Sequence, residues 1–130
     1  MKKGIILLAG IILLTACHES LEERAAREAK EFTQKNCPTP VRDNTRTDSL
    51  TYDADTRTIS YWYTLCGPAD NAEIIKEKKA TLTNTLLEGV KGSMQLKAYK
   101  DEGFNIRYVY HSEKEPQKTL LDVTFTEKDY

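Results

Sequence analysis

The sequence is poor in the residues and patterns that most enzymes use for catalysis. It holds three cysteines, two histidines and one tryptophan in 130 residues. The patterns GxSxG, HExxH and CxxC are absent, as are a phosphate-binding glycine loop and an EF-hand loop. We therefore expect a non-enzymatic protein with no catalytic residue, no metal site and no cofactor.

An excess of charge of one sign is also lacking. Lysine and arginine total 19 against 20 aspartates and glutamates, for a formal net charge of −1. Because no basic excess is present, we expect no nucleic-acid partner. The main apolar run, residues 4–14, is shorter than the about 20 residues of a membrane-spanning helix.

That apolar run follows Lys2 and Lys3 and ends in Leu14-Thr15-Ala16-Cys17. A cationic start, a short apolar stretch and small residues at its end are typical of a secretory signal. The last four residues resemble the lipobox of bacterial lipoproteins. The resemblance implies that residues 1–16 are cleaved and that the Cys17 thiol carries diacylglycerol, with a further acyl chain, such as palmitate, on the new amino terminus. Several chains anchor a protein lastingly, since each buried CH₂ contributes about 0.8 kcal/mol.

The lipobox also predicts where the mature protein lies. His18, rather than an aspartate, follows Cys17, which among lipoproteins favours the outer membrane; the periplasmic and surface faces both stay open. Residues 17–20 would be the lipidated cysteine and a short tether, and residues 21–130 a single domain. Loss of Lys2 and Lys3 changes the formal charge from −1 to −3. This domain resembles the small envelope lipoproteins of bacteria, without the motifs of a family of defined activity.

Hydrophobic periodicity predicts the α+β order helix, hairpin, helix, hairpin over residues 20–35, 44–65, 70–92 and 104–125. Ser20 with Glu23, and Asp70 with Glu73, match helix capping boxes. A short further helix should end at Gly103. The simplest architecture is a four-stranded, mostly antiparallel sheet (αββαββ) with the helices packed on one face. The strand order is left open.

Cys37 and Cys66 remain as an even pair once Cys17 is lipidated. The envelope is oxidising, and the first predicted hairpin brings its two ends together. We therefore predict a Cys37–Cys66 disulfide, which would stabilise the fold by about 3–4 kcal/mol. Two buried free thiols are the alternative, and two cysteines with no nearby histidine argue against zinc.

One group of side chains is a candidate ligand face. Trp62 is out of phase with the apolar side of its strand, and the same face should carry Arg107, His111 and Asp122. An aromatic ring among polar groups suits a glycan or a peptide. The alternative is an ordinary solvated face, or a Trp62 that packs under a loop.

The leading functional hypothesis is a lipid-anchored envelope module that binds a protein or glycan partner or supports an assembly. Such a binder should expose a broad apolar or aromatic patch. One alternative is a hydrolase inhibitor that presents the 113–117 loop. Another is a small enzyme built on Arg107, His111 and Asp122, which should show a cleft with perturbed titratable groups.

Overall fold

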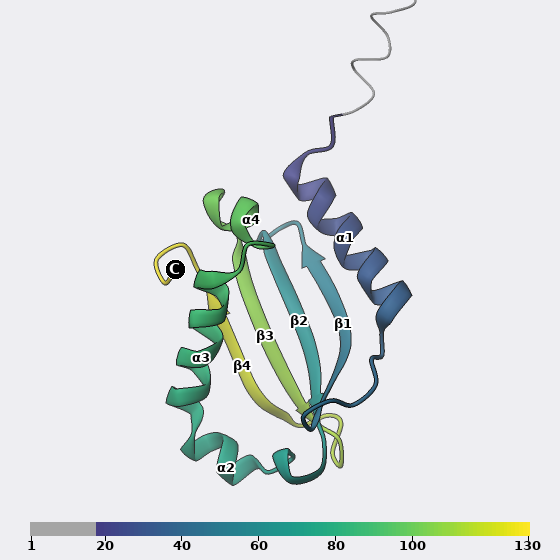
Figure 1. The fold of residues 1–130 in the computed structure, drawn as a ribbon, viewed down its shortest axis with the longest axis vertical. Coiled ribbons are helices and arrows are strands. Elements are labelled where there is room, and N and C mark those ends of the chain that lie inside the picture. Colours follow the sequence, from purple (N-terminus) through teal and green to yellow (C-terminus); the bar gives the residue numbers. More distant parts are fainter. Residues whose placement is uncertain (1–17) are drawn as a thin grey trace, which may run out of the picture.

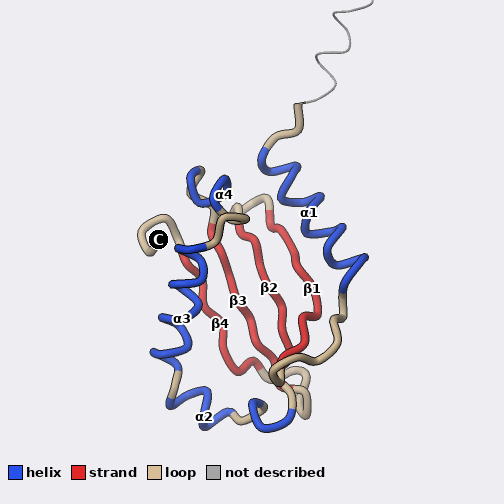
Figure 2. Tube along the Cα trace, in the orientation of Figure 1, coloured by secondary structure: helices blue, strands red, loops and turns tan. Residues whose placement is uncertain are grey.

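The structure, a computed structural model, describes residues 18–130. The predicted signal peptide and the lipidated Cys17 lie outside the described residues. The chain forms helices and a four-stranded sheet in the predicted order, as Figures 1 and 2 show. The α+β prediction is therefore confirmed. Within residues 18–130, no helix has the length and apolar character needed to cross a bilayer.

The strands lie in the sheet in sequence order. They are β1 (Thr45–Asp53), β2 (Thr58–Leu65), β3 (Asn105–Ser112) and β4 (Thr119–Phe125). The two hairpins, β1–β2 and β3–β4, are antiparallel, and β2 pairs with β3 in parallel. A parallel pair requires a long crossover, which the helices between β2 and β3 supply. The two hairpins thus join side by side through the centre of the sheet.

Helix α1 (Leu21–Asn36) begins at the predicted capping box. The Glu23 N–H donates to the Ser20 hydroxyl at 3.1 Å, and the Ser20 N–H donates to the Glu23 carboxylate at 3.3 Å. The helix packs on β1. There the Thr33 hydroxyl donates to the Leu50 carbonyl and accepts from the Leu50 N–H, both at 2.9 Å. These bonds hold α1 over the β1 edge of the sheet.

The second helical region is more divided than predicted. After a 3-10 turn (Gly67–Ala69) come α2 (Ala72–Glu77), α3 (Lys79–Gly92) and α4 (Lys97–Asp101). The predicted cap at Asp70 is wrong: Asn71 accepts from the Glu73 and Ile74 N–H groups, while Asp70 accepts from the Lys114 N–H. Gly103, at φ +73°, ends the last turn as predicted.

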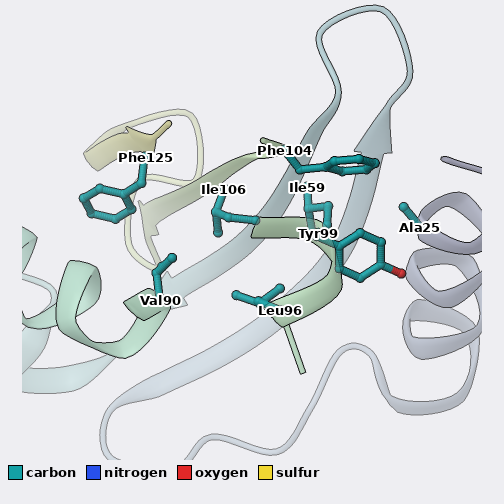
Figure 3. Packing of buried hydrophobic residues seen from close by; sticks show 8 residues of the cluster. All are labelled: Ala25, Ile59, Val90, Leu96, Tyr99, Phe104, Ile106 and Phe125. Atoms are coloured by element: carbon teal, nitrogen blue, oxygen red, sulfur yellow. The ribbon is translucent and has the colours of Figure 1, made fainter. Parts of the chain in front are cut away.

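A buried core gathers at the end of the sheet near the start of α1 (Figures 1 and 3). It joins α1, α3 and α4 to strands β2, β3 and β4. Its members are Ala25, Ile59, Val90, Leu96, Tyr99, Phe104, Ile106 and Phe125. A smaller cluster of Leu65, Ile75 and Leu121 seats α2 against the sheet. The helices are thus held over β1 on one side and over β4 on the other.

The structure contains no Cys37–Cys66 disulfide: both thiols are free. The segment after α1 runs along the outer edge of β1, where the Thr39 N–H donates to the Thr47 carbonyl at 3.0 Å. Cys66 instead follows β2, one strand further into the sheet. Strand β1 therefore lies between the two cysteines. The hairpin does close as predicted, but Cys37 lies outside it.

Candidate functional site

Four tyrosines stand on the helix-covered face of β2 and β3, between α1 and α3. Tyr61 pairs in register with Tyr108, and Tyr63 with Tyr110. We call this group the tyrosine platform. All four side chains are half-buried, so neither flanking helix covers them fully. The platform is thus an aromatic surface that the helices leave partly exposed.

The four rings stack on one another. The centroids of Tyr61 and Tyr108 are 5.0 Å apart at 11°, and those of Tyr63 and Tyr110 are 4.8 Å apart at 19°. Along β2, Tyr61 and Tyr63 lie 6.4 Å apart and are almost parallel, at 5°. Because the rings cover one another's faces, they project their edges and hydroxyls away from the sheet. The platform is therefore apolar below and polar at its top.

The platform hydroxyls have unused hydrogen-bonding capacity. None of them bonds to another residue of the 18–130 domain, whereas the Tyr99 hydroxyl donates to Glu28 at 3.0 Å. None is sealed from solvent either. Burial of the rings raises the pKa of Tyr61, Tyr63, Tyr108 and Tyr110 above the ordinary tyrosine value. All four hydroxyls therefore stay protonated at neutral pH and are available as donors.

A hollow lies on each side of the platform. The first, of about 480 Å³, is lined by α1, α4 and the sheet, and includes Ala29, Phe32, Leu50, Tyr61 and Leu96. The second, of about 300 Å³, includes Leu65, Ile75, Leu82, Leu86 and Tyr110. Phe32 is 38% exposed although it lines the first hollow. The hydroxyl-topped platform thus lies between a recess of mixed polarity, whose lining also includes Arg24, Glu28, Glu31 and Lys35, and a mainly apolar one.

The opposite face of the sheet carries the ligand face predicted from the sequence, and the structure brings its members together. The Arg107 guanidinium lies over the Trp62 ring at 5.1 Å, and the His111 ring stacks on Trp62 at 6.1 Å. Arg107 also forms a bidentate pair with Asp122, at 2.9 and 2.7 Å. A hollow of about 760 Å³ adjoins Trp62, Arg107 and Asp122.

These contacts engage the Trp62 ring with two neighbouring side chains, although Trp62 itself is only half-buried. Trp62 pairs with Val109, and Arg107 and His111 lie on either side of Val109 along β3. The two side chains therefore approach the ring from opposite sides, and the indole N–H donates to the Thr51 hydroxyl at 2.8 Å. A sugar that stacks on an aromatic ring needs an open ring face. Glycan binding at this face stays a prediction.

The arrangement of Arg107, His111 and Asp122 is that of an ion pair beside a stacked ring. The Arg107 hydrogen bonds hold the pKa of Asp122 below its usual range, so this carboxylate is charged at neutral pH. His111 Nδ1 is buried without a hydrogen-bond partner among the described residues. A catalytic histidine is normally oriented through its second ring nitrogen, and that support is missing for Nδ1.

The 113–117 loop, predicted to protrude in an inhibitor, is exposed along its whole length, and the backbone of its first three residues is hydrogen-bonded. The Glu113 N–H donates to the Leu65 carbonyl at 3.1 Å, and the Lys114 N–H donates to Asp70 at 3.0 Å. The Glu115 N–H donates to the Ser112 hydroxyl at 3.0 Å. The loop is therefore exposed and anchored at its start, and its presentation to a hydrolase stays a prediction.

The four tyrosines were not predicted from the sequence to form a site. One signal was available. A sheet face fully covered by helices is usually rich in Val, Ile and Leu, whereas here four positions in register are tyrosine. Tyrosine suits surfaces that are apolar on one side and wet on the other.

The fold is shared with solved structures of other bacterial proteins. A Pseudomonas aeruginosa protein, provisionally described as secreted, matches at TM-score 0.66 and 10% identity over 86% of this chain and 98% of its own. EpsS, a pilotin of the Vibrio vulnificus type II secretion system, matches at TM-score 0.60 and 10% identity over 83% and 89%. AspS, the type II secretion pilotin of Vibrio cholerae, matches at TM-score 0.58 and 12% identity over 84% and 91%. At these identities the likeness concerns the fold.

The family follows from the sequence itself. Residues 20–121 match the family described as "Domain of unknown function (DUF8479)", and the chain belongs to it. A comparison with curated protein sequences finds no match. The matched range begins at the α1 cap and ends within β4, so the family is defined by the domain and not by its leader.

Proposed function

We propose that this protein is a lipid-anchored, non-enzymatic module of the cell envelope that binds a protein partner during the assembly of an envelope apparatus. The observation that carries the proposal is the tyrosine platform, an aromatic surface left open between α1 and α3. Its fold, shared with two pilotins of type II secretion systems, supports an assembly role. Acylated Cys17 would attach the module to membrane lipid, with the outer membrane favoured.

The position of α1 sets the orientation of the module. The helix begins at Leu21, four residues after Cys17. In Figure 1 the start of α1 and α4 lie at the same end of the domain. That end would face the membrane, and the far end, with the 113–117 loop, would point away from it. The tyrosine platform would then face sideways, parallel to the membrane surface, and would not be in contact with the membrane.

In-cell photocrosslinking tests the proposal. A photoreactive amino acid replaces Thr85, an exposed α3 residue that lines the hollow beside Tyr110. The matched control carries it at Thr124, which is exposed on the opposite face of the sheet. We expect a discrete adduct with an envelope protein from position 85 and none from position 124. Deleting the gene for this lipoprotein should then lower the amount of the crosslinked partner in the outer-membrane fraction.

Equal adducts from both positions, or none from position 85, would contradict the proposal. The anchor is tested separately by Cys17→Ala, which should abolish metabolic labelling with a fatty acid. Labelling that persists would reject the lipidation, while leaving the binding surface to be judged by the crosslink.

A further inference from the structure

We propose that the turn between α3 and α4 is a second membrane contact, in which Met94 enters the interface of the same phospholipid bilayer that holds the Cys17 anchor. This inference rests on the proposed function, because it requires the lipidated Cys17. It goes further by naming a part of the folded domain that touches the bilayer and thereby sets the direction in which the tyrosine platform faces.

Met94 is the most exposed large apolar side chain among residues 18–130. It is 80% exposed, against 52% for Val41, 43% for Ile74 and 38% for Phe32. Single exposed apolar residues are common on folded domains. Met94 differs from the other three in its position and in the way its turn is fixed.

The turn holds Met94 outward. Leu96, two residues further on, is 6% exposed and lies among the core residues (Figure 3). The Leu96 N–H donates to the Ser93 hydroxyl, and the Lys97 N–H donates to the Met94 carbonyl, both at 3.3 Å. The Lys100 ammonium donates to two carbonyls near the end of α3, at 2.7 and 2.8 Å. The exposure of Met94 is therefore a property of a turn that hydrogen bonds and a buried neighbour fix in place.

The short tether brings this turn close to the membrane. Cys17 precedes Leu21, the first residue of α1, by four positions, and four extended residues span at most about 14 Å. The start of α1 and α4 lie at the same end of the domain, and α2 lies at the opposite end (Figure 1). Met94, three residues before α4, therefore belongs to the end that the anchor holds near the bilayer. Ile74, in α2, belongs to the end directed away from it.

The residues around Met94 suit the headgroup region of a bilayer. Residues 91–100 include three lysines and no acidic residue. Lys91 and Lys97 have side chains that are 46% and 61% exposed, and each pairs with one exposed carboxylate outside this range, at 3.6 and 3.0 Å. Lysine lays its methylenes along an apolar surface and keeps its ammonium group in water. The lysines can therefore stay at the level of the lipid phosphates while the Met94 thioether enters the acyl boundary.

A contact of this size is sufficient because the anchor has already brought the domain to the surface. One apolar side chain would not recruit a soluble domain to a bilayer. A tethered site, however, meets its ligand at a high effective concentration, so a small contact can orient a domain that it could not recruit. With the α4 end held at the bilayer, the tyrosine platform would face sideways.

A reporter next to Met94 tests the contact. An environment-sensitive fluorescent amino acid replaces Gln95, which is exposed, in the lipidated protein reconstituted into vesicles of phosphatidylethanolamine and phosphatidylglycerol. We expect a blue-shifted emission that spin-labelled lipids quench. The same reporter at Lys76, exposed on α2, should show neither effect. Met94→Ser should lower the quenched fraction at position 95 about tenfold, since the burial of one methionine side chain is lost. Ile74→Ser is the matched control and should leave it unchanged.

Three results would overturn the inference: an aqueous emission at position 95, equal quenching at positions 95 and 76, or quenching that Met94→Ser leaves unchanged. A blue shift in the unlipidated Cys17→Ala protein that grows with its concentration would also overturn it, because a second copy would then cover Met94. If the adduct from position 85 persists in these cases, the proposed binding surface stands. Loss of that adduct while position 95 is quenched as expected would reject the binding surface alone, and absence of fatty-acid labelling at Cys17 would reject both the anchor and the second contact.

Discussion

The two faces of the sheet both carry clustered aromatic side chains, but they differ in how far those side chains are already satisfied. On the uncovered face, Trp62 has Arg107 and His111 beside its ring and Thr51 as a hydrogen-bond acceptor. On the helix-covered face, the four tyrosine hydroxyls bond to no other described residue. Exposure alone does not distinguish the two faces. The unmet hydrogen-bonding capacity does, and it places the candidate site on the tyrosine face.

We therefore expect one face to contribute to stability and the other to binding. Substitutions around Trp62 should mainly change stability, because the contacts there are made within the domain. Removal of a platform hydroxyl should mainly change binding, because its partner is not part of the domain. Stability and crosslinking, measured on the same variants, test whether the two faces have these separate roles.

The largest effect should come from the buried residues beneath the two faces. Ile106→Ala removes a fully buried core residue and should lower the free energy of unfolding by about 2–5 kcal/mol. Val109→Ala, at the position that pairs with Trp62 and is 1% exposed, should lower it by about 1–3 kcal/mol. Urea unfolding of the leaderless Cys17→Ala protein measures both. A Val109→Ala variant as stable as its parent would show that the uncovered face has no packed layer of its own.

Trp62→Ala should come next, at about 2 kcal/mol, because it removes the stacked ring and exposes Val109. Trp62→Phe is the matched control. It keeps an aromatic ring beside Arg107 but loses the hydrogen bond to Thr51, and should cost about 1 kcal/mol. Neither variant should change the adduct formed from position 85. A lost adduct at full stability would move the binding site to the uncovered face.

The sequence predicted the elements of this fold better than their junctions. The capping box at Ser20 and the alternation in β2 and β3 depend on local residues, and both were confirmed. The break at Lys78 and the cap at Asn71 were missed. In the structure the Asp70 carboxylate accepts a hydrogen bond from the Lys114 N–H, which belongs to a loop distant in sequence. Such competition between distant groups leaves no local pattern.

The same limit applies to the sites. Alternation was sufficient to place Trp62, Arg107, His111 and Asp122 on one face, and the structure brings them together. Alternation could not show that these four side chains already contact one another. Nor could it show that α1 and α3 keep to the edges of the sheet, because the separation of two helices depends on packing across the whole domain. The openness of the tyrosine platform is therefore a tertiary property.

Helix α1, which flanks the tyrosine platform, provides a third prediction. Thr33→Val keeps the shape of the side chain but removes the hydroxyl that bonds both to the carbonyl and to the N–H of Leu50. The loss should be about 1–3 kcal/mol, because two backbone groups lose their partner. Thr124→Val, on the exposed opposite face, should stay within about 0.5 kcal/mol of the parent. Equal effects would mean that α1 is held mainly by its alanine contacts.

The smallest effect should come from the Arg107–Asp122 pair. Its side chains are 34% and 40% exposed, so solvent screening limits its contribution to about 1 kcal/mol or less. Because Arg107 lowers the folded-state pKa of Asp122, the contribution is fully present above the unfolded value of about 3.9 and is lost as the pH falls through the folded value. Asp122→Asn should therefore be less stable than the parent at pH 6, and the two should converge towards pH 3. Asp101→Asn, whose pair with Lys97 is more exposed at 60% and 61%, is the matched control and should differ less at pH 6. A difference for Asp122→Asn that persists at pH 3 would show that the carboxylate acts through packing and not through its charge.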